Sequence, residues 1–203
     1  MAQAQAKIPP RPLSLRILHE ALMAAILLLI VTGFYIHRPF VADGGGFLMS
    51  LMRGVHFFAA AVLIVVAVLR IIRMFVGPNK DWQSFIPTGA DLKLFLRFVN
   101  YYARLATKPE IEKRYNPFQM LSYILVFLLV IFQIITGFTL LYPDGWLRFI
   151  SYGIFNNEIN VRVAHLIVTW IFLLFLMIHV YLGIRESFQE MKGMHLLSDT
   201  EEK

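Results

Sequence analysis

The stretch VRVAHLIVTWIFLLFLMIHVYLGIRE, residues 161–186, is apolar enough to cross a membrane, yet it contains two histidines fourteen residues apart, His165 and His179. In an α-helix, at ~100° and ~1.5 Å per residue, this spacing falls ~40° short of four full turns and separates the residues by ~21 Å. We therefore expect both rings on one helix face, one near each membrane surface. Because a polar ring within lipid is costly unless a partner satisfies it, the two histidines indicate a functional role.

The composition of the chain is typical of a membrane protein. Of its 203 residues, 58% are hydrophobic and 16% are charged, whereas about a quarter of the residues of soluble domains are charged. Four apolar runs can cross ~30 Å of hydrocarbon, at about residues 17–36, 54–76, 118–142 and 161–184. No small-residue cleavage site accompanies the first run, so we expect it to be a retained span. The sequence thus predicts an all-α integral membrane protein, one domain built as a four-helix transmembrane bundle.

The distribution of Lys and Arg predicts the orientation. Four spans place both termini and the loop at 77–117 on one side, and that side holds 15 of the 19 basic residues. The remaining four are Arg38, Arg53, Arg148 and Arg162. The positive-inside rule therefore puts both termini in the cytoplasm. Contact of the basic loops with anionic lipid explains the net charge of +6 without any nucleic acid.

Two loops are expected to contain short interfacial helices. In the cytoplasmic loop, Thr88 and Asp91 form a weak capping-box signal. Apolar residues then follow at helical spacing, namely Leu92, Phe95, Leu96, Val99 and Ala103. On the other side, PDGWLRFISYGIFNN at 143–157 opens with a turn and continues as an aromatic-rich segment suited to the outer membrane surface.

Two other histidines match the levels of those in the last span. His19 lies at the cytoplasmic start of the first span, and His56 lies near the outer start of the second. This predicts two pairs, His19 with His179 on the inside and His56 with His165 on the outside. Paired imidazoles from facing helices are what a six-coordinate b-type haem requires. A zinc or copper site would need three or four ligands at one level, and no carboxylate or thiol cluster completes one.

His37 is the competitor of His56 for the outer level. It lies in YIHRPF, at the end of the first span beside a proline, where a solvated ring costs little. We therefore rank His37 below His56 as a haem ligand. The chain contains no cysteine, so any haem is bound without covalent attachment, and no iron–sulfur cluster can be held by this chain.

Three of the candidate ligands follow an arginine at the same spacing. The pairs are Arg16 with His19, Arg53 with His56, and Arg162 with His165. Each arginine lies one turn outward of its histidine on the same face, where a guanidinium can neutralise a haem propionate. The alternative is that arginines simply mark the helix ends.

A short internal echo links the first and third spans. IVTGFYI at 30–36 resembles IITGFTLL at 134–141, and each lies near the outer end of its span. Gly33 and Gly137 occupy equivalent positions in the two segments. They either allow close helix packing or leave room for something flat and wide.

Several segments together resemble a known family. They are WLRFISYGIFNNEINVRVAHLIVTWIFLLFLMIHVYLGIRE at 146–186, RPLSLRILH at 11–19, VTGFYIHRPF at 31–40, LMRGVHFFAAAVLIVVAVLRI at 51–71 and RYNPFQMLSYILVFLLVIFQIITGF at 114–138. The chain resembles the b-type cytochrome subunit of membrane-bound nickel–iron hydrogenases, which is similar in plan to the gamma subunit of respiratory formate dehydrogenase. This resemblance implies two haems b with the ligand pairs given above. It also implies that hydrogenase small and large subunits on the outer face pass electrons inward to menaquinone or ubiquinone, in a respiratory hydrogen:quinone oxidoreductase.

Three residues are candidates for the quinone site. The resemblance to formate dehydrogenase places Asn116, in RYNPF, where that family has an asparagine near the quinone, although Asn116 can equally cap the following helix. Glu20 departs from the family pattern, in which an aromatic residue usually follows the first histidine. It is interpreted either as a proton relay facing the quinone or as a solvated carboxylate at a helix start. Gln119 lies near the same level.

Other functions remain open at this point. The chain could be a free-standing dihaem cytochrome b oxidoreductase, which would be active when purified alone. It could also be the gamma subunit of a formate dehydrogenase, or a plain membrane anchor that binds no haem. In the relay interpretation, electrons enter on the outer side, cross to the inner side and reduce a quinone near the cytoplasmic face, and no side chain of this protein breaks a substrate bond.

Overall fold

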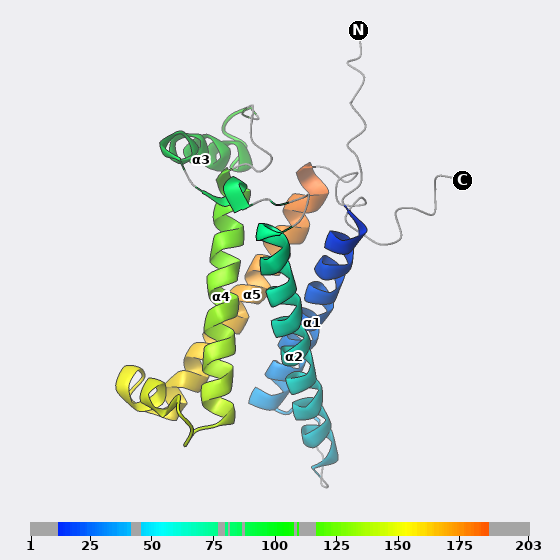
Figure 1. The fold of residues 1–203 in the computed structure, drawn as a ribbon, viewed down its shortest axis with the longest axis vertical. Coiled ribbons are helices and arrows are strands. Elements are labelled where there is room, and N and C mark those ends of the chain that lie inside the picture. The colour runs from blue at the N-terminus through cyan, green and yellow to red at the C-terminus, as the bar shows by residue number, and fades with distance from the viewer. Residues whose placement is uncertain are drawn as a thin grey trace, which may run out of the picture. The chain divides into compact units, whose positions relative to one another are not determined.

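The computed structural model describes residues 12–41, 46–76, 80, 82–86, 88–107, 109 and 117–186. Over these ranges the chain is helical, with five α-helices and two short turns (Figure 1). The helices are α1 (Leu13–His37), α2 (Phe47–Phe75), α3 (Gly89–Tyr102), α4 (Pro117–Leu141) and α5 (Glu158–Glu186), and the turns are η1 (Trp82–Phe85) and η2 (Ile150–Ile154). The four α-helices other than α3 are long and apolar enough to cross a membrane. The predicted fold class, an all-α protein with four membrane spans, is confirmed.

The helix α2 begins seven residues before the expected start of the second apolar run. Gly46 precedes it with φ of 68°, a left-handed conformation that glycine adopts without strain. The first helical hydrogen bond runs from the N–H of Ser50 to the carbonyl of Gly46, at 3.0 Å. The charge of Arg53 ends the apolar run but does not end the helix, because arginine is a good helix former. His56 therefore lies inside α2 and not at its start, which corrects the sequence-based boundary.

The chain forms two compact units. The first consists of residues 1–70 and 166–203, and the second of residues 71–165. The long helices α2 and α5 each contribute to both units, because the divisions fall within them.

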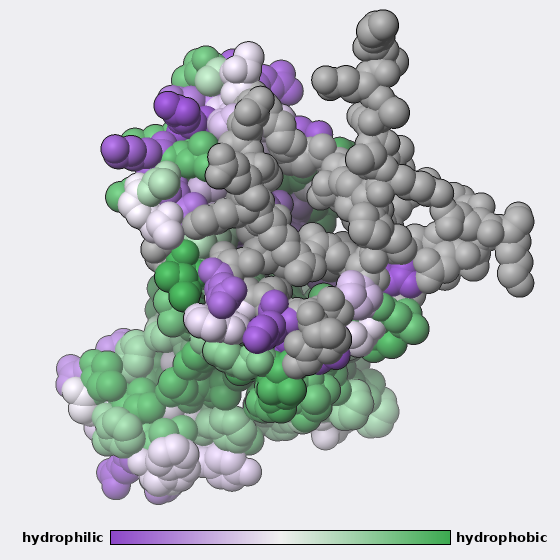
Figure 2. Space-filling view, turned by 45° about the horizontal axis from the view of Figure 1, so that its top comes forward, coloured by the Kyte–Doolittle hydropathy of each residue, from purple (hydrophilic) through white to green (hydrophobic). Residues whose placement is uncertain are grey.

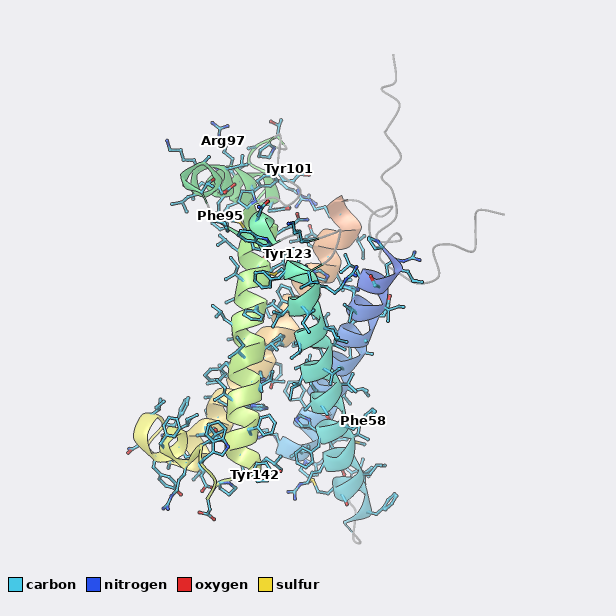
Figure 3. All side chains as sticks on the ribbon, viewed as in Figure 1. Phe58, Phe95, Arg97, Tyr101, Tyr123 and Tyr142 are labelled. Carbon is cyan, nitrogen blue, oxygen red and sulfur yellow. The ribbon has the colours of Figure 1, made fainter. Side chains whose placement is uncertain are left out.

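In the first unit, α1 contacts α2 through the side chains of Thr32 and His56. It contacts α5 through the rings of Phe34 and Trp170. Ala25 on α1 and Ala59 on α2 are almost fully buried. Large apolar side chains are exposed instead, such as Val31 and Phe58. Phe58 of α2 is labelled in Figure 3. The visible surface over the long helices is largely hydrophobic (Figure 2). This inside-out pattern suits a lipid surrounding, in which exposed apolar side chains carry no penalty.

In the second unit, α4 packs against α3 and η1. The ring of Phe98 on α3 is fully buried beside Tyr101 and Tyr102. Figure 3 shows Phe95, Arg97 and Tyr101 on α3 near the end of α4 that bears Tyr123.

The helix predicted in the loop at 77–117 is confirmed as α3. The backbone N–H of Thr88 donates to Asp91 Oδ2 at 2.7 Å, so the predicted capping box is present. Leu92 and Leu96, on the predicted apolar face, stay exposed. An exposed apolar face of this kind suits a helix that lies at a membrane surface.

The connection from α4 to α5 begins with the predicted turn. The N–H of Gly145 donates to the carbonyl of Tyr142 at 3.0 Å. Asn157 Oδ1 then accepts a hydrogen bond from the N–H of Asn160 at 2.8 Å, which caps the start of α5. Glu158 accepts a hydrogen bond from the Tyr152 hydroxyl, and this bond raises the pKa of Tyr152 above its ordinary value. This connection and α3 lie at opposite ends of α4 (Figure 1).

Candidate haem site

The two histidines predicted for the inner level lie side by side in the first unit. His19 of α1 and His179 of α5 have ring centroids 6.3 Å apart, with 40° between the ring planes. Two imidazoles that bind one iron from opposite sides have ring centres roughly 6 Å apart, from a metal–nitrogen bond of ~2 Å and a further ~1.2 Å from nitrogen to ring centre. The observed spacing therefore fits a metal ion held between the two rings.

An aromatic neighbour orients one member of this pair. The ring of Phe175, one turn before His179 on α5, stacks on the His179 ring with centroids 5.5 Å apart and 26° between the planes. Stacking of this kind restricts rotation of the imidazole.

The three arginines of the sequence pattern differ in burial. Arg16, one turn before His19, is only 2% exposed, whereas Arg53 and Arg162 are exposed. A guanidinium buried in a membrane protein needs anionic or polar company, because an unpaired charge there is costly. Of the three, Arg16 thus has the surroundings best suited to holding a carboxylate such as a haem propionate.

His56, predicted for the outer level, is held by α1 within the first unit. Thr32 Oγ1 lies 2.8 Å from His56 Nδ1. The same hydroxyl donates to the carbonyl of Leu28 at 2.6 Å. A Cβ placed on Gly33 would lie 3.4 Å from His56 Cε1, so the imidazole lies directly against the glycine.

His165 has the same surroundings within the second unit. Thr136 Oγ1 lies 2.8 Å from His165 Nδ1 and donates to the carbonyl of Phe132 at 2.8 Å. A Cβ on Gly137 would lie 3.6 Å from His165 Cε1. In addition, Gln133 Nε2 donates to the backbone carbonyl of His165 at 3.2 Å.

These contacts give the Thr-Gly echo of the sequence a specific meaning. Sequence reasoning considered Gly33 and Gly137 as positions for helix packing or for a flat group, and in each unit the neighbour at the glycine is a histidine ring. It missed Thr32 and Thr136 altogether. The signal was present, since a threonine precedes each glycine of the echo. His56 belongs to the first unit and His165 to the second, so their pairing stays a prediction from the sequence.

His37 lies where the sequence placed it. It is the last residue of α1 and is exposed. It borders a groove of about 680 Å³. The other lining residues are Phe34, Arg38, Pro39, Phe40, Leu166 and Trp170.

The quinone candidates are on different helices. Glu20 is half-buried on α1, seven residues after Leu13, and α1 has no acidic residue in its first turn. The interpretation of Glu20 as a carboxylate at a helix start is therefore wrong, because the helix begins earlier than the apolar run. Gln119 is half-buried near the start of α4, in the second unit. Asn116 lies outside the described residues.

Histidine pairs, and not larger clusters, are the possible metal ligands in the described part of the chain. Across those ranges no group of three His, Cys, Asp or Glu side chains could hold a metal ion. Two imidazoles suffice for haem, because the porphyrin supplies the other four nitrogens.

Known proteins resemble this chain over most of its length. Residues 11–195 match the family model described as prokaryotic cytochrome b561. A probable Ni/Fe-hydrogenase B-type cytochrome subunit from Rhizobium leguminosarum is 32% identical over 189 residues, which cover 85% of this chain and 78% of the relative. The protein of the same description from Bradyrhizobium diazoefficiens is 32% identical over 188 residues, covering 85% and 76%. The probable Ni/Fe-hydrogenase 1 B-type cytochrome subunit of Escherichia coli K12 is 29% identical over 189 residues, covering 85% and 80%.

Proposed function

The chain belongs to the prokaryotic cytochrome b561 family, and we propose that it relays electrons through a bacterial cytoplasmic membrane from an iron–sulfur partner on the outer face to a quinone near the cytoplasmic face. Its family and its four membrane-spanning helices make it a membrane cytochrome b. Bound haem supplies reversible one-electron chemistry. The protein supplies ligands, charge neutralisation and exclusion of water.

The observation that best supports the proposal is the spacing of His19 and His179. Their rings come from two different helices and leave the separation that a bis-imidazole iron needs. We propose that they hold an inner haem b, with the buried Arg16 beside a propionate. His56 and His165 would hold an outer haem b, because the sequence puts them at one level of the membrane. Their local settings, each a threonine and a glycine, are alike.

We propose nickel–iron hydrogenase small and large subunits as the partner. The relatives from Rhizobium, Bradyrhizobium and Escherichia coli are each described as a B-type cytochrome subunit of such an enzyme. This chain contains no cysteine, so an iron–sulfur centre that donates electrons has to belong to another subunit.

The electron acceptor is proposed to be menaquinone or ubiquinone at the cytoplasmic level. Reduction of a quinone consumes two electrons and two protons, so a group that passes protons from the cytoplasm is needed near it. The half-buried Glu20 is one residue after the inner ligand His19 and is suited to this role. Gln119 and Asn116 are proposed as further contacts of the quinone.

The decisive experiment is to purify the chain with its hydrogenase partner and to measure haem by the pyridine haemochrome assay. We expect two b haems per chain, both reduced by hydrogen and both reoxidised by a quinone analogue. One haem per chain would show that a ligand pair is misassigned, and none would remove the proposal. Quinone reduction by the chain alone with a small reductant would favour the free-standing oxidoreductase.

The orientation can be tested separately, because the natural chain has no cysteine. Single cysteines introduced as Lys80→Cys and Trp146→Cys lie in the two loops that should face opposite sides, and Trp146 is 84% exposed. In intact spheroplasts a membrane-impermeant maleimide should label Trp146→Cys and leave Lys80→Cys unlabelled. The reverse pattern would place the termini outside.

A further inference from the structure

Thr32 and Thr136 are buried threonines whose hydroxyls both contact candidate haem ligands. They are 2% and 1% exposed. Each makes two short contacts, one to a backbone carbonyl four residues earlier and one to a histidine Nδ1. The proposed function assigns a role to the histidines here, but it gives none to the threonine hydroxyls.

The positions of the protons follow from counting donors at Thr32. The carbonyl of Leu28 has no proton, so its 2.6 Å contact requires the hydroxyl proton of Thr32 to lie between the two oxygens. A hydroxyl has only one proton, so the 2.8 Å contact to His56 Nδ1 requires that this nitrogen has its own proton and donates it. His56 then has its lone pair on Nε2, the nitrogen that can bind a metal. The same count applies to Thr136 and His165.

We propose that Thr32 and Thr136 are positioning residues, which fix the Nδ1-protonated tautomer of His56 and His165 and so leave the Nε2 lone pair of each ring available to the iron of the outer haem. This inference rests on the proposed function, since it requires these histidines to be ligands. Gly33 and Gly137 lie beside the same rings, because a Cβ at either position would be in van der Waals contact with the histidine Cε1. The Thr-Gly echo is thus a repeated ligand-holding device, present once in each unit.

The hydrogen bond also affects the electronic properties of the ligand. Donation from Nδ1 to an oxygen makes the imidazole a stronger electron donor, as with histidine ligands of metals that are bonded to a carboxylate or carbonyl. A stronger donor stabilises ferric over ferrous iron. Because each threonine passes its own proton to a carbonyl, the oxygen is a better acceptor than an isolated hydroxyl. Removal of the hydroxyl should therefore raise the midpoint potential of the outer haem.

The test uses threonine substitutions in the membrane complex with a matched control. Thr32→Val and Thr136→Val keep the branched shape and remove the hydroxyl, and Thr32→Ser and Thr136→Ser restore a hydroxyl. The control is Thr139→Val, because Thr139 is also buried in α4 and donates to its own i−4 carbonyl at 2.8 Å. The readouts are haem affinity, the midpoint potentials of both haems and the low-spin ferric EPR spectrum.

We expect each valine variant to bind the outer haem roughly tenfold less tightly, the low end for loss of a hydrogen bond to a metal ligand. Its midpoint potential should rise, and a tenfold change in relative stabilisation of the ferric form equals ~59 mV for one electron. The EPR signal of the outer haem should shift, and the inner haem should not change. Serine should restore the potential, and Thr139→Val should alter neither haem.

The possible failures can be told apart. A wild-type complex without haem would remove the proposed function and this inference with it. A wild-type complex with two haems, together with valine variants of unchanged affinity, potential and EPR spectrum, would overturn the threonine assignment and leave the proposed function intact. An equal shift in Thr139→Val, or a shift that serine does not reverse, would assign the effect to packing and would also overturn the assignment.

Discussion

The inner and outer histidines of the first unit are held in different ways. At the inner level, His19 and His179 face one another from two helices, 6.3 Å between ring centres, and Phe175 stacks on one of them. At the outer level, the ring of His56 lies against the backbone at Gly33 and is hydrogen-bonded to Thr32. One level is organised by ring packing, and the other by a hydrogen bond and a glycine.

This difference has a thermodynamic consequence for cofactor binding. A ligand that is already fixed in its binding orientation loses little side-chain entropy when it binds, whereas a less restrained ring must be ordered by the cofactor. The outer ligands should therefore depend on the polypeptide around them, and the inner ligands more on the cofactor between them. Substitutions of neighbouring residues should affect the two levels unequally.

Removal of a ligand should have the largest effect, and the loss of haem should be equal at the two levels. We expect His179→Ala and His56→Ala each to lower the haem content from two to one per chain, because a six-coordinate haem that loses one axial ligand binds weakly. A redox titration should show that each variant loses a different haem.

His37→Ala is the matched control for the ligand substitutions. It removes an exposed histidine at the end of α1 and should retain both haems. Loss of haem in this variant, with both haems retained in His56→Ala, would transfer the outer ligand to His37.

Filling the space at Gly33 should damage the outer level alone. A Cβ at Gly33 would lie 3.4 Å from His56 Cε1, in ordinary contact, so we expect the additional carbon atoms of Gly33→Leu to crowd the ring. Overpacking of this kind costs ~1–3 kcal/mol, which corresponds to up to about a hundredfold in haem affinity. Gly54→Leu is the control. Gly54 lies two residues before His56 on α2, and nothing lies within 4 Å of a Cβ at this position. Equal haem loss in the two variants would mean that the glycine contact has no special role.

Loss of the Phe175 ring should weaken the inner level by a smaller amount. Aromatic pairs contribute ~0.5–1.5 kcal/mol beyond area burial, so Phe175→Leu should lower inner haem affinity by roughly twofold to tenfold. Phe34→Leu is the control, because it makes the same change at a ring whose edge contact, at 4.7 Å, is with Trp170. If Phe175→Leu instead weakened the outer haem, the assignment of the levels would be wrong.

The sequence was sufficient to predict the membrane helices and the proximity of His19 and His179, for physical reasons. Membrane thickness fixes the length of an apolar run, and helical periodicity fixes which residues share a face, so His19 and His179 could be brought together by counting. Boundaries were less accurate, because hydropathy ends at Arg53 while the helical hydrogen bonds continue to Gly46. Asn116 lies outside the described residues, and its role stays a prediction.

The threonines could not be identified from the sequence in the same way. A threonine in a membrane helix satisfies its hydroxyl on its own i−4 carbonyl, as Thr139 does, so it gives no signal of a second partner. Only the packing of α1 on α2 shows that Thr32 also reaches His56. The repeated Thr-Gly pair was the available clue. To use it, one must know which side chain faces each glycine.

The smallest expected effect concerns Glu20, which follows His19 in the sequence and which we propose as a proton relay for the quinone. Adjacent helical residues point ~100° apart, so Glu20 cannot share the iron with His19. Glu20 is half-buried and lies beyond the first turn of α1, where the helix dipole acts, and its role as a proton relay is our proposal. Glu20→Gln should therefore keep both haems and their reduction by the partner, while quinone reduction slows several-fold. Glu158→Gln removes a carboxylate at the start of α5 and is the control, with unchanged turnover. Unchanged quinone turnover in Glu20→Gln would confine Glu20 to a structural role, and haem loss in that variant would place it in the ligand pocket.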